Sequence, residues 1–167
     1  FMTLMLKPEI NPNNASMLTL VAALAVAEAI KDVTGLDARI KWPNDIVING
    51  KKICGILTEM SAQFDYINHI VIGIGINVHN EAFPEEISAV AGSILLESGG
   101  RRFRRAEIIE KTLEHFEEYY EIYLQTEDLS ALTADYNALL VNMNKQVKVL
   151  DPCLLYTSPS PRDISGS

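Results

Sequence analysis

The stretch Ile70-Val71-Ile72-Gly73-Ile74-Gly75-Ile76-Asn77-Val78 decides the fold of this sequence. Its strict alternation predicts a β-strand that buries the isoleucines on one face. The opposite face carries Gly73 and Gly75, which weaken a strand interior without adding any packing, so something must approach that backbone closely. Either a neighbouring helix or strand does so, or a flat ligand lies on the sheet. The carboxamide of Asn77, which can both donate and accept hydrogen bonds, favours the ligand.

The residues that precede this strand predict a β-hairpin. β-rich stretches cover residues 39–42, 46–48 and 52–60, and Asn49-Gly50 separates the last two. Asn-Gly is the strongest short signal for a type I′ turn, because both central residues of that turn need a positive φ. The hairpin returns Lys52 to the end of the sheet that holds Asn44 and Asp45. A cation, a carboxylate and an amide are therefore expected to meet there.

Helices are expected on either side of this β-rich region. The first begins at Asn14 or Ser16 as its N-cap and ends at Gly35 as a left-handed C-cap. A later helix has a row of glutamates, interpreted as a solvated face, opposite a stripe that we expect to be buried. That stripe consists of Ile109, Leu113, Phe116, Tyr120 and Leu124. A further helix over residues 129–140 and a strand over residues 146–150 complete the prediction.

Composition limits the class of protein. The chain has 167 residues, 48% of them hydrophobic, and a formal net charge of -8, which predicts one domain with a substantial core. The acidic balance argues against a protein that mainly neutralises nucleic-acid phosphates. The longest apolar run, residues 17–27, is shorter than the ~20 residues of a membrane span. No secretory signal opens the chain and its two cysteines provide no disulfide framework, so we expect a cytoplasmic location.

A local excess of positive charge surrounds the hairpin. Residues 31–52 hold five Lys and Arg against three Asp in a chain whose net charge is negative. Such a reversal can focus an anionic ligand. Lys52 is the best candidate for that contact, because the turn dictates where its side chain points. The three histidines lie at no metal-ligand spacing, so a zinc site is not expected.

Three motifs, in this order and spacing, resemble the catalytic domain of biotin protein ligases, the biotin–[acetyl-CoA-carboxylase] ligases. They are Lys41-Trp42-Pro43-Asn44-Asp45, then Lys52-Ile53-Cys54-Gly55-Ile56-Leu57-Thr58-Glu59, then Gly73-Ile74-Gly75-Ile76-Asn77. The resemblance extends from about Leu4 to Asp151. It implies an α+β fold, the class II synthetase-like biotin/lipoate ligase domain, in which helices pack on one face of a mixed β-sheet.

The same resemblance implies an activity. A ligase of this kind uses ATP and Mg²⁺ to convert biotin to biotinyl-5′-AMP and pyrophosphate, and then transfers the biotinyl group to a lysine of a biotin carboxyl carrier protein. The implied catalytic residues are Lys52, which contacts biotin and the phosphoryl centre, and Asp45, close to the reaction centre. Asp45 either binds Mg²⁺ or orients the acceptor amine, and both roles stay open. A homodimer is compatible with the resemblance, whereas a membrane or nucleic-acid partner is not expected.

The implied binding residues are Trp42, Asn44, Lys52, Gly73, Gly75 and Asn77. Biotin lies over the two glycines, and the two asparagines lie near the adenosine and the phosphates.

The resemblance also implies that the chain is truncated at both ends. Residues 1–144 are interpreted as a partial catalytic domain and residues 145–151 as the first strand of a truncated C-terminal β-barrel. Residues 152–167, rich in Pro and Ser, are interpreted as a disordered, non-native tail. The family's Gly-Arg-Gly-Arg-Arg-Gly-Arg loop would lie upstream of Phe1, so we expect this piece alone to have weak or no activity.

Three other functions remain as alternatives. A lipoate or octanoate ligase or transferase would use the same fold with a different acyl pocket. A biotin-sensing repressor would need a DNA-binding helix-turn-helix upstream. A non-catalytic interaction module would keep the sheet for dimerisation, but the retention of Lys52 and Asn77 favours catalysis.

Overall fold

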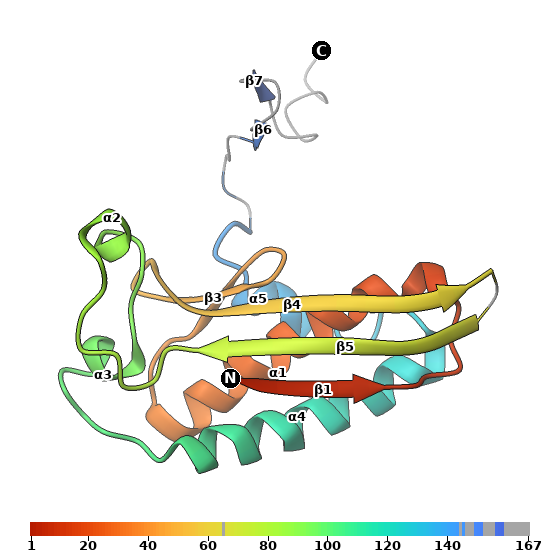
Figure 1. Ribbon diagram of the computed structural model, residues 1–167, viewed down its shortest axis with the longest axis horizontal. Helices are drawn as coiled ribbons and strands as arrows, with labels where there is room; N and C mark the ends of the chain where they lie inside the picture. The colour runs from red at the N-terminus through yellow and green to blue at the C-terminus, as the bar shows by residue number, and fades with distance from the viewer. Residues whose placement is uncertain (65, 144, 146–148, 152–155, 159–167) are drawn as a thin grey trace.

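A five-stranded antiparallel β-sheet organises the computed structural model (Figure 1), which describes residues 1–64, 66–143, 145, 149–151 and 156–158. Its strands are β1 (Met2–Leu6), β2 (Arg39–Lys41), β3 (Asp45–Ile48), β4 (Lys51–Gln63) and β5 (Tyr66–Ile76). Their order across the sheet is β1-β5-β4-β3-β2. Parallel pairing within the described residues is limited to two isolated bridges, Ile40–Leu140 and Lys52–Ala91.

Two long helices cover one face of this sheet, and the opposite face of β1, β5 and β4 carries no helix among the described residues (Figure 1). The helices are η1 (Pro12–Met17, a 3-10 helix), α1 (Leu18–Thr34), α2 (Glu85–Ser88), α3 (Ile94–Glu97), α4 (Arg105–Thr126) and α5 (Thr133–Leu139). The α+β class with helices on one face is thereby confirmed. None of the helices in the described part of the chain has the length and hydropathy required to cross a bilayer.

The alternation of β5 builds the core as predicted. Ile70, Ile72 and Ile74 are completely or almost completely buried against α1 and its surroundings. Helix α1 can approach the sheet closely because most of its buried positions are alanine or valine. The bare face of β5, with its glycines, consequently points away from the helices.

The predicted turns are confirmed. Asn49 and Gly50 connect β3 to β4 with φ values of 51° and 77°, the positive values that a type I′ turn requires. Gly35 ends α1 with φ 71° and donates its N–H to the Lys31 carbonyl. The local chemistry of these residues is enough to determine the backbone at both places.

The predicted N-cap of the first helix is wrong. Neither Asn14 nor Ser16 caps α1; instead Asn11 accepts a hydrogen bond from the Asn13 N–H at the start of η1, and α1 continues directly from η1. Pro12, whose fixed φ suits the first position of a helix, moves the start upstream. The N–H groups that begin α1 follow a turn that is already formed, so no side-chain cap is needed there.

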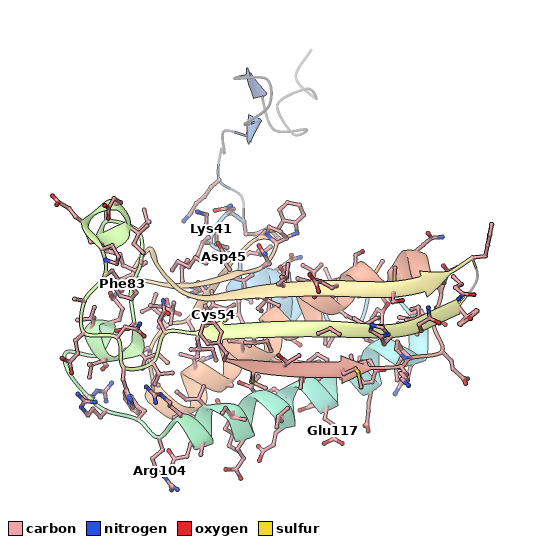
Figure 2. All side chains as sticks on the ribbon, viewed as in Figure 1. Lys41, Asp45, Cys54, Phe83, Arg104 and Glu117 are labelled. Carbon is pink, nitrogen blue, oxygen red and sulfur yellow. The ribbon has the colours of Figure 1, made fainter. Side chains whose placement is uncertain are left out.

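Part of the buried stripe of α4 is displaced by one residue from the prediction. Phe116 is buried as expected, but Ile109, Leu113 and Leu124 are 40–41% exposed. The residues that α4 buries are Ile108, Thr112, Phe116 and Tyr123. Thr112 fits in the interface because its hydroxyl donates to the Ile108 carbonyl within the helix, which satisfies its polarity. The glutamate row is solvated as predicted, and Figure 2 shows Glu117 directed away from the sheet.

The predicted C-terminal elements are confirmed only in part. Helix α5 is shorter than the predicted 129–140, and β6 (Val149–Asp151) pairs with β7 (Tyr156–Ser158) in a separate two-stranded sheet. Residues 146–148, 152–155 and 159–167 lie outside the described residues. The proposed boundaries at residues 145–151 and 152–167 therefore remain predictions.

We expect Tyr136→Phe to leave the protein as stable as the wild type or slightly more stable. The Tyr136 hydroxyl is buried on α5 and has no hydrogen-bond partner among the described residues. An unsatisfied buried hydroxyl costs roughly 1–3 kcal/mol, so its removal recovers part of that penalty. Urea unfolding monitored by circular dichroism measures the change. A loss of more than about 1 kcal/mol, the net contribution of a typical hydrogen bond, would show that the hydroxyl has a partner.

Candidate functional site

A cavity of about 670 Å³ opens on the bare face of the sheet, at the end where β4 begins and β5 ends. Asp45, Cys54 and Phe83 lie at this end in Figure 2. Six of the seven site residues predicted from the sequence line the cavity, and they are Asn44, Asp45, Lys52, Gly73, Gly75 and Asn77. The structure therefore brings together residues that the chain separates by more than thirty positions.

The floor of the cavity consists of glycines on two neighbouring strands. Gly75 of β5 lies opposite Gly55 of β4, and Gly73 lies opposite Leu57. A Cβ built on Gly73 would meet only the Leu57 carbonyl oxygen, at 3.8 Å, which is ordinary van der Waals contact. Packing within the protein does not require a glycine at position 73. The bare backbone there faces open space of a size that a small ring can occupy.

Gly55 is a floor residue that the sequence prediction missed. It belongs to the second quoted motif, but its place opposite Gly75 depends on the register between β4 and β5. Gly75 has a closer neighbour, because the Phe1 ring carbon Cε1 lies 2.8 Å from the position of an added Cβ. The Phe1 side chain is itself fully exposed and lines the cavity, so it covers the floor at Gly75 and leaves Gly73 open.

The ammonium group of Lys52 lies over this floor. Its Nζ is 2.6 Å from Asp45 Oδ1 and 3.4 Å from the position of a Cβ on Gly55. The side chain of Lys52 is 51% exposed and that of Asp45 22%. An ion pair this exposed contributes little to stability, about 0–1 kcal/mol. An anionic ligand in the cavity can therefore compete with Asp45 for the lysine at small cost.

Two asparagines hold fixed orientations at the cavity wall. Asn44 Nδ2 donates to the Ile56 carbonyl at 2.9 Å, and Asn77 Nδ2 donates to the Gly92 carbonyl at 3.1 Å. Each amide nitrogen is thus bonded to the backbone, which leaves the amide oxygen as an acceptor for a ligand N–H or hydroxyl group. These contacts orient both side chains before any ligand arrives.

Trp42 lies apart from the other predicted site residues. It is 62% exposed and lines a second cavity of about 380 Å³, together with residues of η1, α1 and β4. Asn44 lines both cavities, so the two adjoin across the turn that connects β2 to β3. The spacing of the motif could not indicate the side of this turn on which the indole would lie.

The segment that follows β5 forms a further wall of the main cavity. The sequence prediction did not include this segment in the site. Phe83, Ile87 and Ala91 of this segment line the main cavity. They carry no periodic pattern that would have marked them as site residues. Their position depends on long-range backbone bonds, such as the one that the Lys52 N–H donates to the Val90 carbonyl at 2.7 Å.

Cys54 is expected to resist alkylation in the folded protein. The residue is 1% exposed, and burial, followed by the negative charge of Asp45, raises the pKa of its thiol to about 12 from 9.0. A raised pKa lowers the thiolate fraction at a given pH, to about one in ten thousand at pH 8, and only the thiolate reacts. The rate should rise about tenfold for each unit of pH below that pKa.

Iodoacetamide labelling at pH 8 tests this expectation, with peptide mass spectrometry to distinguish Cys54 from Cys153. Protein unfolded in urea provides the control, in which Cys54 should label readily. Equal labelling rates in the folded and unfolded states would contradict the assignment of a buried, protonated thiol.

A few oxygen atoms among the described residues at the cavity could bind a metal ion. No group of three His, Cys, Asp or Glu residues suited to a metal ion occurs in the part of the chain that the structure describes. Asp45 is the carboxylate that lines the cavity, beside the amide oxygens of Asn44 and Asn77. One carboxylate with substrate phosphates and water is a donor set that Mg²⁺ commonly uses in nucleotide sites.

The sequence comparisons with known proteins all indicate the same family. Residues 1–77 match the model of the Biotin/lipoate A/B protein ligase family. The bifunctional ligase/repressor BirA of Bacillus subtilis is 44% identical over 126 residues, which cover 74% of this chain and 38% of that protein. The biotin–[acetyl-CoA-carboxylase] ligase of Mycobacterium tuberculosis is 32% identical over 135 residues, which cover 79% of this chain and 47% of that protein. The chain thus spans less than half the length of these relatives.

Solved structures agree with the sequence comparison. The apo biotin protein ligase of Aquifex aeolicus superposes with a TM-score of 0.77 at 28% identity, covering 87% of this chain and 62% of that one. The structure of the Aquifex aeolicus biotin protein ligase in complex with biotin and ATP gives a TM-score of 0.76 at 26% identity, covering 95% of this chain and 65% of that one. These neighbours share the antiparallel sheet with helices described above.

Proposed function

Since residues 1–77 belong to the biotin/lipoate A/B protein ligase family, we propose that this chain carries the site at which ATP activates biotin to biotinyl-5′-AMP. In the second step the biotinyl group passes to a lysine of a biotin carboxyl carrier protein. One observation supports this proposal above the others: an open floor at Gly73 lies beside the Lys52 ammonium. The relative from Aquifex aeolicus, whose structure contains biotin and ATP, has a similar fold.

Biotin lies with its ring system over the glycine floor in this proposal. Gly73 allows the ring to contact the backbone directly, and at Gly75 the ring displaces the exposed side chain of Phe1. The carboxylate then points toward Lys52. A carboxylate oxygen attacks the α-phosphorus of ATP, the bond to the pyrophosphate breaks, and pyrophosphate leaves. Because both reactants are anionic, a fixed cation between them lowers the barrier as charge develops. Lys52 supplies that cation by exchanging its contact with Asp45 for the substrates.

The nucleotide lies beyond Lys52, between Asn44, Asn77 and the apolar wall of Phe83 and Ile87. The amide oxygens of the two asparagines accept hydrogen bonds from the nucleotide, and Phe83 provides a flat surface for its base. Mg²⁺ would be held by Asp45 and the substrate phosphates, where it would neutralise phosphate charge. Trp42, in the adjoining cavity, lies outside this arrangement.

Transfer to the carrier protein uses the same end of the sheet. The neutral amine of the acceptor lysine attacks the acyl carbon of biotinyl-5′-AMP, an amide bond forms, and AMP leaves with the bonding electron pair. Asp45 lies beside Lys52 at this end of the sheet, and in this proposal it orients the amine and accepts its proton. Metal binding and amine orientation both remain within the proposal for Asp45.

For the 167-residue chain alone we propose weak or no turnover. The cavity is open on the side away from the sheet and Lys52 is half-exposed, so water can reach an adenylate formed there. Measuring biotin-dependent exchange of pyrophosphate into ATP tests this part of the proposal. Exchange at a rate of about 1 s⁻¹ or more, the ordinary range for enzymes, would contradict it.

A lipoate or octanoate ligase is the second candidate, because the matched family includes lipoate ligases. Competition between biotin and lipoate for the cavity separates the two functions. We expect biotin to displace a fluorescent biotin analogue and lipoate to fail at equal concentration. Displacement of the analogue by lipoate and not by biotin would show that the chain is a lipoate ligase instead.

A further inference from the structure

The segment that follows β5 forms a closed loop, which we call the cavity loop and define as residues 80–93. Its ends meet where the buried Ser93 donates its hydroxyl to the Asn80 carbonyl at 2.6 Å. Such compact loops with adjacent ends are often functional. Helix α2 lies within the loop, beyond the ends of β4 and β5 in Figure 1, and Phe83 and Ile87 line the main cavity.

The cavity loop has little packing of its own. Helix α2 contains no buried residue, and Ile87 and Val90 are 44% and 61% exposed. A segment with so few buried contacts depends on its hydrogen bonds for its position. Whatever holds the loop therefore decides where its apolar wall stands relative to a ligand.

The C-terminal end of the loop is held by the backbone of β4. Gly92 N donates to the Lys52 carbonyl at 2.9 Å, and Asn77 Nδ2 donates to the Gly92 carbonyl. A Cβ on Gly92 would lie 2.7 Å from Lys51 Cβ, so a glycine is needed for this close approach. These contacts place the stem of Lys51 directly against the loop.

The middle of the loop is held by a side chain. Lys51 Nζ donates to the Ser88 carbonyl at 3.1 Å and to the Ala89 carbonyl at 2.6 Å, at the end of α2. Carbonyls at a helix end lack partners within the helix, and a charged donor makes a comparatively strong hydrogen bond to them. Within the described residues, Lys51 thereby connects the start of β4 to the part of the loop that carries Ile87.

We propose that Lys51 is a positioning residue for the nucleotide half of the site. It holds the cavity loop so that Phe83 and Ile87 face the adenylate, while the neighbouring Lys52 contacts the reacting groups. The inference rests on the function proposed above. It predicts that loss of the Lys51 charge weakens binding of the adenylate and leaves binding of biotin, over the glycine floor, unchanged.

The test compares Lys51→Met, Lys51→Arg and the wild-type chain, with Lys41→Met as the control for loss of an exposed lysine on another strand of the sheet, β2. Titrations use biotin alone and a non-hydrolysable biotinyl-5′-AMP analogue. For Lys51→Met we expect an analogue affinity about tenfold weaker, the size of effect that follows from losing a charge-assisted hydrogen bond. Biotin affinity should be unchanged, and both Lys51→Arg and Lys41→Met should bind the analogue as the wild type does.

Hydrogen exchange of the ligand-free proteins provides a second, independent measurement. Amides of residues 83–91 should exchange faster in Lys51→Met than in the wild type, with the amides of β5 unchanged. Equal weakening for biotin and the analogue, failure of Lys51→Arg to restore binding, or unchanged loop exchange would each overturn the positioning role. A wild-type chain that binds neither ligand would instead overturn the proposed function, whereas hydrogen exchange would still decide whether Lys51 anchors the loop.

Discussion

Lys52→Ala is expected to reduce formation of biotinyl-5′-AMP by a factor of about 10²–10³, the usual cost of removing one group that stabilises charge in a transition state. The experiment belongs in a longer ligase that contains these residues, where turnover is measurable by pyrophosphate exchange. The fold should persist, because the ion pair between Lys52 and Asp45 is half-exposed and contributes about 0–1 kcal/mol to stability. The melting temperature should therefore change little.

Lys41→Ala is the matched control for this experiment. Lys41 is an exposed lysine at the end of β2, close in sequence to Asp45, and it does not line the main cavity. Its replacement should leave pyrophosphate exchange unchanged. Turnover by Lys52→Ala at a rate close to that of Lys41→Ala would remove Lys52 from the mechanism.

Gly73→Val should abolish most biotin binding without unfolding the protein. A Cβ at position 73 meets nothing closer than 3.8 Å, and valine favours extended backbone, so β5 can accept it. The added methyl groups would stand on the floor where the biotin ring is proposed to lie. Overpacking of about 1–3 kcal/mol corresponds to an affinity loss of roughly fivefold to 150-fold. Calorimetric titration with biotin measures the loss.

Val71→Ile is the control for the floor. Val71 lies on the same face of β5, two residues before Gly73, and outside the cavity lining. The additional methyl group there should leave biotin affinity unchanged. If Gly73→Val binds biotin as tightly as Val71→Ile does, biotin does not lie over the glycine floor.

The part of the site that local chemistry controls could be predicted from the sequence. Alternation places Gly73 and Gly75 on one face of β5, and Asn77 follows directly after this strand. The turn at Asn49 and Gly50 returns Lys52 to the end of the sheet that carries Asp45. Both arguments involve only neighbours along the chain. These residues line one cavity in the structure, while their roles in binding and catalysis remain proposals.

Features that depend on tertiary contacts could not be predicted. The position of the cavity loop depends on hydrogen bonds such as the one from Lys51 Nζ to the Ala89 carbonyl. No pattern in the sequence predicts such a contact. In α4, several apolar stripes compete, and packing against α1 selects the one that contains Thr112. The side on which Trp42 lies depends on the geometry of a short turn. The predicted homodimer and cytoplasmic location remain predictions.

The proposed function requires a ligand that lies over the glycine floor with its anionic groups at Lys52. A heteronuclear NMR titration of the 167-residue chain with a non-hydrolysable biotinyl-5′-AMP analogue tests this most directly, because it detects even weak binding residue by residue. We expect the largest shifts at the amides of Gly55, Gly73, Gly75 and Asn77, and smaller shifts with the corresponding lipoyl analogue. Shifts concentrated at other residues, or no shifts at the highest soluble concentration of the analogue, would contradict this position of the ligand.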